Sequence, residues 1–391
     1  MASPENGNPL MVQSHLREFN GKKSDNIVAE LERKPWTVGE YKKQTWGIRL
    51  HNMSPYVGRM KPSLAHWLVR ICSKPGEVVL DPFCGIGTVP LEADLLRRRA
   101  IGIELNPYAL VISKAKFDRR PLHEQIEWLR KVKLDLENVD IENIPDSIKQ
   151  FYHEKTLREL LALKKRIEEE NRTFLLGCLL GISHGHRPQH LSSITGYIVP
   201  YKYAKHKPEY KPVIPKMIAK VKRMYSSPFP KETSAYILKG DARALPFRED
   251  SIDVVISSPP YYSTIDYVES NWLRLQLLGI VEDQKIIKEN LIQHERTYLT
   301  EMRKVGNELR RVLKCNSLCV FVLGDFPKKG ATLNTAENVR KIFSELGFSS
   351  LGIIEDEIPI TKRTAVKWIG GEALKSHPKK FDRILVMRID K

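Results

Sequence analysis

The sequence lacks long apolar runs. No stretch of eighteen consecutive apolar residues occurs in its 391 residues, and the N-terminus shows no basic region followed by an apolar run. The first absence argues against a membrane span, and the second against a secretory signal peptide. Because 41% of the residues are nevertheless hydrophobic, we expect a cytoplasmic protein with a sizeable core.

Cysteine is scarce as well. The chain has five cysteines, an odd number with scattered spacing, so a disulfide framework is not expected. Cys315 and Cys319 have no partner pair nearby, and we expect them to be small buried hydrophobic residues. His184, His186 and His190 lie in a loop without a cysteine or an acid to complete a ligand set. No metal site is therefore expected.

Acidic residues are outnumbered, with 47 Asp and Glu against 64 Lys and Arg and a formal net charge of +17. A positive field of this size draws polyanions, which favours nucleic acid as the partner. Between positions 201 and 223, lysines that suit phosphates interleave with tyrosines that suit unpaired bases. A solvated helix face is the alternative for this stretch, which includes Lys220, Lys222 and Arg223. The oligomeric state is not indicated.

Short apolar segments predict the strands of a sheet. They are Val78–Asp81, Ala100–Glu104, Tyr236–Lys239, Val254–Ser257, Leu318–Leu323, Leu351–Ile354 and Ile384–Met387. Helical patterns separate them, which is the signature of a parallel sheet. We expect an α/β fold with a doubly wound, mostly parallel, seven-stranded Rossmann-like sheet.

The alternation of strand and helix stops after the second strand and resumes at the third. This gives four expected parts: a polar, irregular N-terminal tail or wrapping arm over 1–45, a first part of the sheet domain over 46–121, a mainly helical insertion over 122–235, and the rest of the sheet domain over 236–391. We expect the insertion to serve substrate recognition.

A glycine loop follows the first strand and opens a helix. It reads Asp81-Pro82-Phe83-Cys84-Gly85-Ile86-Gly87-Thr88. Two glycines one residue apart let the chain turn tightly and let a ligand approach the backbone. Asp81 ends its strand at the crevice where open α/β sheets bind ligands, and Glu104 ends the next strand, where an acid can take both ribose hydroxyls of a nucleoside.

A dinucleotide is the alternative ligand for this loop. The third glycine of a G-x-G-x-x-G motif is absent, however, and position 90 is proline. Asp81 would repel a pyrophosphate but attract a sulfonium with a free amino group. The loop therefore predicts S-adenosylmethionine as the cofactor.

A second motif, Ser258-Pro259-Pro260-Tyr261, ends the fourth strand. The prolines remove backbone donors, which leaves nearby carbonyls free to accept hydrogen bonds, and the tyrosine offers a stacking face. Such a loop suits a planar base whose exocyclic amine must be held and aimed. The base must leave its stack or be single-stranded. The loop has no cysteine, so the covalent route to carbon 5 of cytosine lacks its nucleophile.

Together DPFCGIGT, GIELNP and SPPY resemble the amino-group methyltransferases of nucleic acids. The match of the segment from Tyr56 to Pro62 is weaker, and Gly240-Asp241-Ala242 matches the family's third-strand aspartate. The resemblance implies S-adenosylmethionine as the cofactor, bound by Tyr56, Asp81, Phe83, Gly85, Gly87, Thr88, Glu104 and Asp241.

In the catalytic loop, the resemblance implies that Ser258 and the Pro259 carbonyl accept the amine hydrogens, beside Pro260, and that Tyr261 stacks on the base. Serine at the first position is typical of cytosine N4 enzymes, and aspartate of adenine N6 enzymes. We expect a DNA cytosine N4 methyltransferase, as in restriction–modification systems. A structured-RNA N4 methyltransferase, an adenine N6 enzyme and an inactive nucleic-acid-binding protein stay open. Protein glutamine methyltransferases use Asn-Pro-Pro-Tyr, which Ser258 and the charge disfavour.

Overall fold

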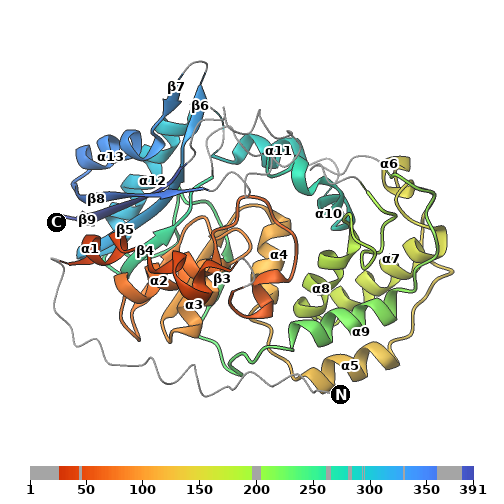
Figure 1. The fold of residues 1–391 in the computed structure, drawn as a ribbon. Helices are drawn as coiled ribbons and strands as arrows, with labels where there is room; N and C mark the ends of the chain where they lie inside the picture. Colours follow the sequence, from red (N-terminus) through yellow and green to blue (C-terminus); the bar gives the residue numbers. More distant parts are fainter. Residues whose placement is uncertain are drawn as a thin grey trace.

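The chain folds around one seven-stranded sheet (Figure 1). The computed structural model describes residues 26–43, 46–195, 204–260, 266–280, 284–292, 294, 296–328, 331–358 and 381–391. The strands of the sheet are β1 Val78–Asp81, β2 Arg99–Glu104, β3 Tyr236–Lys239, β4 Ile252–Ser257, β5 Leu313–Gly324, β8 Phe348–Glu357 and β9 Phe381–Ile389. Each contains one of the seven predicted segments, so the doubly wound α/β fold is confirmed.

The strand order is β3-β2-β1-β4-β5-β9-β8. The first five strands are parallel, and β9 runs antiparallel between β5 and β8. The order reverses between β1 and β4, so the ends of these two strands flank the crevice where such sheets bind ligands. A separate hairpin, β6 Phe326–Lys328 with β7 Ala331–Leu333, was not predicted.

Helices cover both faces of the sheet and fill the insertion. They are α1 Ile27–Glu32, α2 Pro62–Cys72, α3 Thr88–Leu95, α4 Pro107–Ala115, α5 Leu122–Lys131, α6 Asp146–Lys149, α7 Glu154–Glu169, α8 Thr173–Ser183, α9 Val213–Met224, α10 Trp272–Leu277, α11 Gln284–Asn290, α12 Tyr298–Val312 and α13 Thr335–Glu345. Among the described residues, no helix is long and apolar enough to cross a bilayer.

Alternating side chains build a separate core on each face of the sheet. On β4, Val254 and Ile256 join the core with α2 and α3, whereas Val255 joins the core with α12 and α13. This two-residue period follows from the pleat, which points successive side chains to opposite faces. The same alternation along β5 makes the central strands apolar on both sides, as expected for a buried parallel sheet.

The N-terminal arm is more ordered than its polar composition predicts. Its described part contains α1 and two short 3-10 turns, and Leu31 and Trp36 are fully buried. The indole N–H of Trp36 donates to Oδ2 of Asp356 on β8 over 2.8 Å. The expectation of an irregular segment is therefore wrong for these residues, because two apolar side chains are enough to fasten the arm across α2 and β8.

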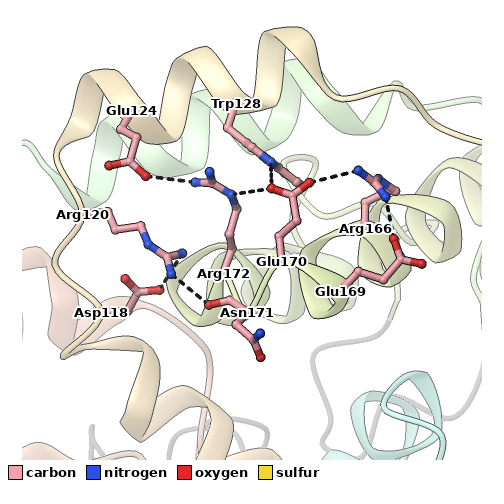
Figure 2. Close-up of polar contacts among 9 residues, drawn as sticks. All are labelled: Asp118, Arg120, Glu124, Trp128, Arg166, Glu169, Glu170, Asn171 and Arg172. Atoms are coloured by element: carbon pink, nitrogen blue, oxygen red, sulfur yellow. Dashed lines mark hydrogen bonds and ion pairs between the residues drawn. The ribbon is translucent and has the colours of Figure 1, made fainter.

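The segment between β2 and β3 forms a helical layer beside the sheet (Figure 1). Its core is α8, which is buried on all sides and packs against α4, α7 and α9. A polar network joins the turn after α7 to α5 (Figure 2): the Arg172 guanidinium contacts Glu124 and Glu170 over 3.4 Å each, and the Trp128 indole N–H donates to Glu170 over 2.6 Å.

Three expectations about single residues need correction or comment. Cys315 is exposed, whereas Cys319 is buried as expected. Lys220, counted with the basic stretch, is only 3% exposed, and its ammonium donates to the Asn52 and Met53 carbonyls. It fastens α9 to the chain before β1 and is not free for phosphate. His184 is buried, and within the described part of the chain no group of His, Cys, Asp and Glu is placed to hold a metal.

Candidate functional site

The glycine loop runs from the end of β1 to the start of α3. Gly87 has φ 72° and ψ 45°, a left-handed conformation that L side chains rarely adopt. A Cβ there would lie 2.2 Å from Oγ of Ser113 on α4. Both the backbone conformation and the close approach to α4 thus require glycine. Gly87 therefore supports the loop conformation from the side that packs on α4.

Glu104 ties the loop to the end of β2. Its carboxylate accepts from the Gly85 amide and the Asn106 amide over 2.7 Å each. Burial raises its pKa to about 7, although these backbone hydrogen bonds oppose the rise. The residue thus supports the loop conformation while it lines the cavity described below.

Asp81 links the two predicted motifs. Its Oδ1 accepts from the Ser257 hydroxyl at the end of β4 over 2.5 Å and from the Phe83 amide over 3.1 Å. Burial raises its pKa to about 7, and the Ser257 hydrogen bond acts in the opposite direction. The end of β4 therefore helps set the charge on the acid of the glycine loop.

Asp241 follows β3 and is held by Arg243. The guanidinium contacts both carboxylate oxygens, reaches Glu301 over 2.6 Å and donates to the Asn290 carbonyl over 3.0 Å. Burial alone would raise the pKa of Asp241, but the hydrogen bonds from Arg243 lower it overall. Arg243, which the sequence did not single out, thus connects this acid to α11 and α12.

Aromatic rings form one wall of the site. Tyr56 is stacked on Tyr267, with ring centroids 5.9 Å apart and planes at 27°, and lies 6.2 Å from Tyr108. Burial raises the pKa of Tyr56 well above its usual value, so the phenol is neutral. The sequence did not indicate Tyr267 as a site residue. It follows the Ser-Pro-Pro-Tyr loop in the chain, and only the fold places it against Tyr56.

The Ser-Pro-Pro-Tyr loop follows β4, which ends at Ser257. The Ser258 hydroxyl donates to the Val322 carbonyl on β5 over 3.1 Å. Ser258 and Pro260 line the cavity, and Pro259 is buried. Tyr261, the expected stacking residue, lies outside the described residues.

One cavity brings these groups together. Its volume is about 840 Å³, counting space open to solvent. The predicted residues on its lining are Tyr56, Asp81, Phe83, Gly85, Thr88, Glu104, Asp241, Ser258 and Pro260. Among the described residues, the lining holds three carboxylates and one cation, Arg59, whose guanidinium donates to the His51 carbonyl and the Asn52 side chain. Asn290, Leu291 and Ile292 also line the cavity, and no sequence pattern had indicated them.

The electrostatics of this cavity suit a positively charged ligand that carries a nucleoside. The carboxylates of Asp81, Glu104 and Asp241 attract cations and can accept hydroxyl or amino hydrogens. Between them lie the apolar Phe83 and Ile103. A pocket of this size and mixed lining is typical of a cofactor site.

Residues 17–115 match the family model N6_N4_Mtase, described as DNA methylase. The matched segment contains residues 17–45 of the arm, Tyr56, the glycine loop and Glu104, and it ends before residue 122. It therefore covers the part of the candidate site formed by the glycine loop and Glu104, and excludes the Ser-Pro-Pro-Tyr loop.

Curated relatives match over short segments. The type II methyltransferase M.MjaII of Methanocaldococcus jannaschii is 28% identical over 89 residues, 23% of this chain and 16% of that protein. M.XycI of Xanthomonas campestris pv. cyanopsidis is 32% identical over 114 residues, which cover 27% of this chain and 37% of that protein. A tRNA (guanine(10)-N2)-dimethyltransferase of Methanothermobacter thermautotrophicus is 40% identical over 52 residues, which cover 13% of this chain and 16% of that protein. The chain thus spans well under half of each relative.

Solved structures resemble the chain over greater lengths at low identity. TrmN from Thermus thermophilus is 12% identical, with 87% of this chain and 52% of that chain covered at a TM-score of 0.36. Geranyl diphosphate methyltransferase in complex with GPP and sinefungin is 8% identical, with 84% and 78% covered at a TM-score of 0.35.

Proposed function

We propose that the chain transfers a methyl group from S-adenosylmethionine to the exocyclic amine of a nucleic-acid base, cytosine N4 in DNA. The match of residues 17–115 to a family model described as DNA methylase supports this proposal. The observation that carries the proposal is the cavity itself. The glycine loop and the catalytic loop both line it, and the Ser257–Asp81 hydrogen bond joins them.

The cavity residues fit this cofactor. Asp81 and Asp241 offer negative charge to a sulfonium and an amino group, and Glu104 offers an acceptor to ribose hydroxyls. A Cβ added at Gly85 would contact the Tyr56 ring at 3.7 Å, so this glycine lies against the aromatic wall of the cavity. When bound, S-adenosylmethionine supplies a methyl group on a positively charged sulfur.

The hydrogen bond of Ser258 prepares it to accept from an amine. Because its only proton points to the Val322 carbonyl, the lone pairs of Oγ remain for another donor. Holding the amine hydrogens in this way favours a more tetrahedral nitrogen with its lone pair aimed for attack. Catalysis then depends on positioning and preorganised acceptors, and the amine can release its proton after transfer.

The site does not favour the covalent route to carbon 5 of cytosine. Cys84 lines the cavity, but burial raises the pKa of its thiol well above the usual range, so the nucleophilic thiolate is disfavoured. Positions 258–266 contain no cysteine. These two facts support amine methylation over carbon methylation.

RNA is the second candidate substrate. It is favoured by the 40% identity over 52 residues to a tRNA (guanine(10)-N2)-dimethyltransferase. The test is transfer of a labelled methyl group from S-adenosylmethionine to genomic DNA and, separately, to total RNA. We expect DNA to be labelled. Labelling of RNA alone would overturn the DNA assignment, and labelling of neither would contradict the activity.

A further inference from the structure

The insertion changes the sign of its charge along the chain. Residues 122–171, which contain α5, α6 and α7, carry twelve Asp and Glu against nine Lys and Arg. Residues 172–224, which contain α8 and α9, carry ten Lys and Arg and a single acid, Glu209. The formal charge is therefore −3 over the first segment and +9 over the second. One layer of helices thus contains two chain segments of different formal charge.

Five of the nine cations of the first segment form ion pairs with neighbouring carboxylates. Lys131 pairs with Glu127 over 2.5 Å and Lys164 with Glu168 over 2.8 Å. Arg166 reaches two glutamates at the end of α7 (Figure 2). A cation whose charge is already balanced by a carboxylate gains little from a phosphate, because the phosphate must also overcome the acid's repulsion.

The second segment presents cations without such partners. Within the described residues, no ion pair with a carboxylate is formed by Arg187, Lys205, Lys207, Lys216, Lys222 or Arg223. Lys216 is half-buried and the other five are exposed. Their charges are therefore compensated only by mobile counterions, which a polyanion releases when it binds.

Two lysines of the same segment do not belong to this surface. The Lys211 ammonium donates to the His190 carbonyl over 3.0 Å and also to the Ser192 carbonyl. Lys220 is buried against the Asn52 and Met53 carbonyls. Both hold the loop and α9 in place, which fixes the backbone that carries the exposed cations.

Contacts place the start of this surface next to the cavity. The loop that carries Arg187 begins at His184, whose carbonyl accepts from the Arg274 guanidinium over 2.6 Å. Arg274 lies over the Tyr108 ring at 5.5 Å, and Tyr108 neighbours Tyr56 on the cavity wall. A strand bound along the loop would therefore pass within a few side chains of the proposed methylation site.

Arg187, Lys216 and Arg223 extend this surface along α9. The Lys216 ammonium donates to the Pro188 carbonyl over 3.2 Å, beside Arg187. Arg223 lies seven residues further, which is two helical turns and about 10 Å along the same side of the helix. We propose that these three residues bind the phosphodiester backbone of the nucleic-acid substrate. The inference rests on the proposed function and assigns its substrate-binding surface.

The test compares two triple variants that remove equal charge. One carries Arg187→Gln, Lys216→Gln and Arg223→Gln. The matched control carries Lys131→Gln, Lys164→Gln and Arg166→Gln on the neutralised surface. Binding to a labelled DNA duplex and to a labelled RNA hairpin is measured by anisotropy over a range of salt concentrations, and cofactor binding by calorimetry verifies the fold.

We expect the first triple variant to bind DNA at least ten-fold more weakly in 0.1 M salt. Its slope of log affinity against log salt should fall by about 2 to 3, since each lost phosphate contact removes about 0.9 from the slope. The control should keep the wild-type slope, and both should keep cofactor affinity. Equal slopes in all three proteins would overturn the proposal that these three residues bind the phosphodiester backbone, and would leave the proposed function intact. Loss of slope for RNA alone would assign the surface to RNA, against the DNA proposal. A wild-type protein that binds neither nucleic acid would overturn both.

Discussion

The hydroxyl of Ser257 donates a hydrogen bond to Oδ1 of Asp81 over 2.5 Å, which joins the end of the catalytic strand to the acid of the glycine loop. This bond lowers the pKa of Asp81 against the larger effect of burial. Ser257→Ala should therefore raise that pKa further, and the affinity for S-adenosylmethionine near pH 7 should fall by about 5- to 10-fold, which corresponds to about 1 kcal/mol, as for one ordinary hydrogen bond.

Calorimetry at several pH values checks this effect. The midpoint of cofactor affinity against pH should move to higher pH in Ser257→Ala. Ser258→Ala is the matched control, because its hydroxyl bonds the Val322 carbonyl and leaves Asp81 untouched. An unchanged midpoint in Ser257→Ala would disprove the link between strand and loop.

The pH dependence of stability has a defined sign. Burial raises the pKa values of both Asp81 and Glu104 to about 7, so between about pH 4 and 7 these two acids hold more protons in the folded protein than in the unfolded chain. The contribution of these two acids to the free energy of unfolding of the protein alone should therefore fall as pH rises through this window, whereas the lowered pKa values of His51 and His190 act in the opposite direction. A cationic cofactor favours the ionised acids, so its stabilising effect should be larger at pH 8 than at pH 5.5. Thermal unfolding with and without S-adenosylmethionine measures both effects. If the stabilisation by the cofactor shrinks with rising pH, Asp81 and Glu104 do not act as ionised partners of the cofactor.

Glu104→Ala should weaken cofactor binding by about 2 kcal/mol, roughly 30-fold, through the loss of a charged acceptor. The structure adds a cost, because the Gly85 and Asn106 amides lose their partner. Calorimetry gives the affinity, and circular dichroism verifies the fold. Unchanged affinity in a folded variant would remove Glu104 from the site.

Arg274→Met should destabilise the protein. The guanidinium is 2% exposed and donates to the Leu180 and His184 carbonyls at the end of α8. Without it two buried acceptors lose a charged donor, and the free energy of unfolding should fall by about 2–4 kcal/mol. Arg303→Met serves as the control: that residue pairs with Glu345 at the surface, so the loss should stay under about 1 kcal/mol. Equal losses in denaturant titrations would show that Arg274 does not hold α8 in place.

The sheet and the glycine loop could be predicted because their signals are local. Apolar segments of four to six residues indicated every strand of the seven-stranded sheet, and Gly87 adopts the left-handed conformation that favours glycine. Lys220 could not be predicted in this way. Its place in a basic stretch suggested an exposed side chain, but in the fold its ammonium donates to the carbonyls of Asn52 and Met53, which are distant in sequence. Tyr267 and Arg243 reach the site only through tertiary contacts. The arm also differs from its prediction. Its composition is polar overall, but two apolar side chains, Leu31 and Trp36, are buried in the fold and give it a defined structure.

The chemical identity of the methylated nucleoside tests the central claim most directly. DNA incubated with the protein and S-adenosylmethionine is digested to nucleosides and analysed by mass spectrometry. The Ser258 hydroxyl, oriented by the Val322 carbonyl, predicts N4-methylcytosine, with product formation reduced at least ten-fold in Ser258→Ala while cofactor affinity is kept. N6-methyladenine as the sole product would contradict the role given to Ser258, and 5-methylcytosine would contradict the whole assignment of the catalytic loop.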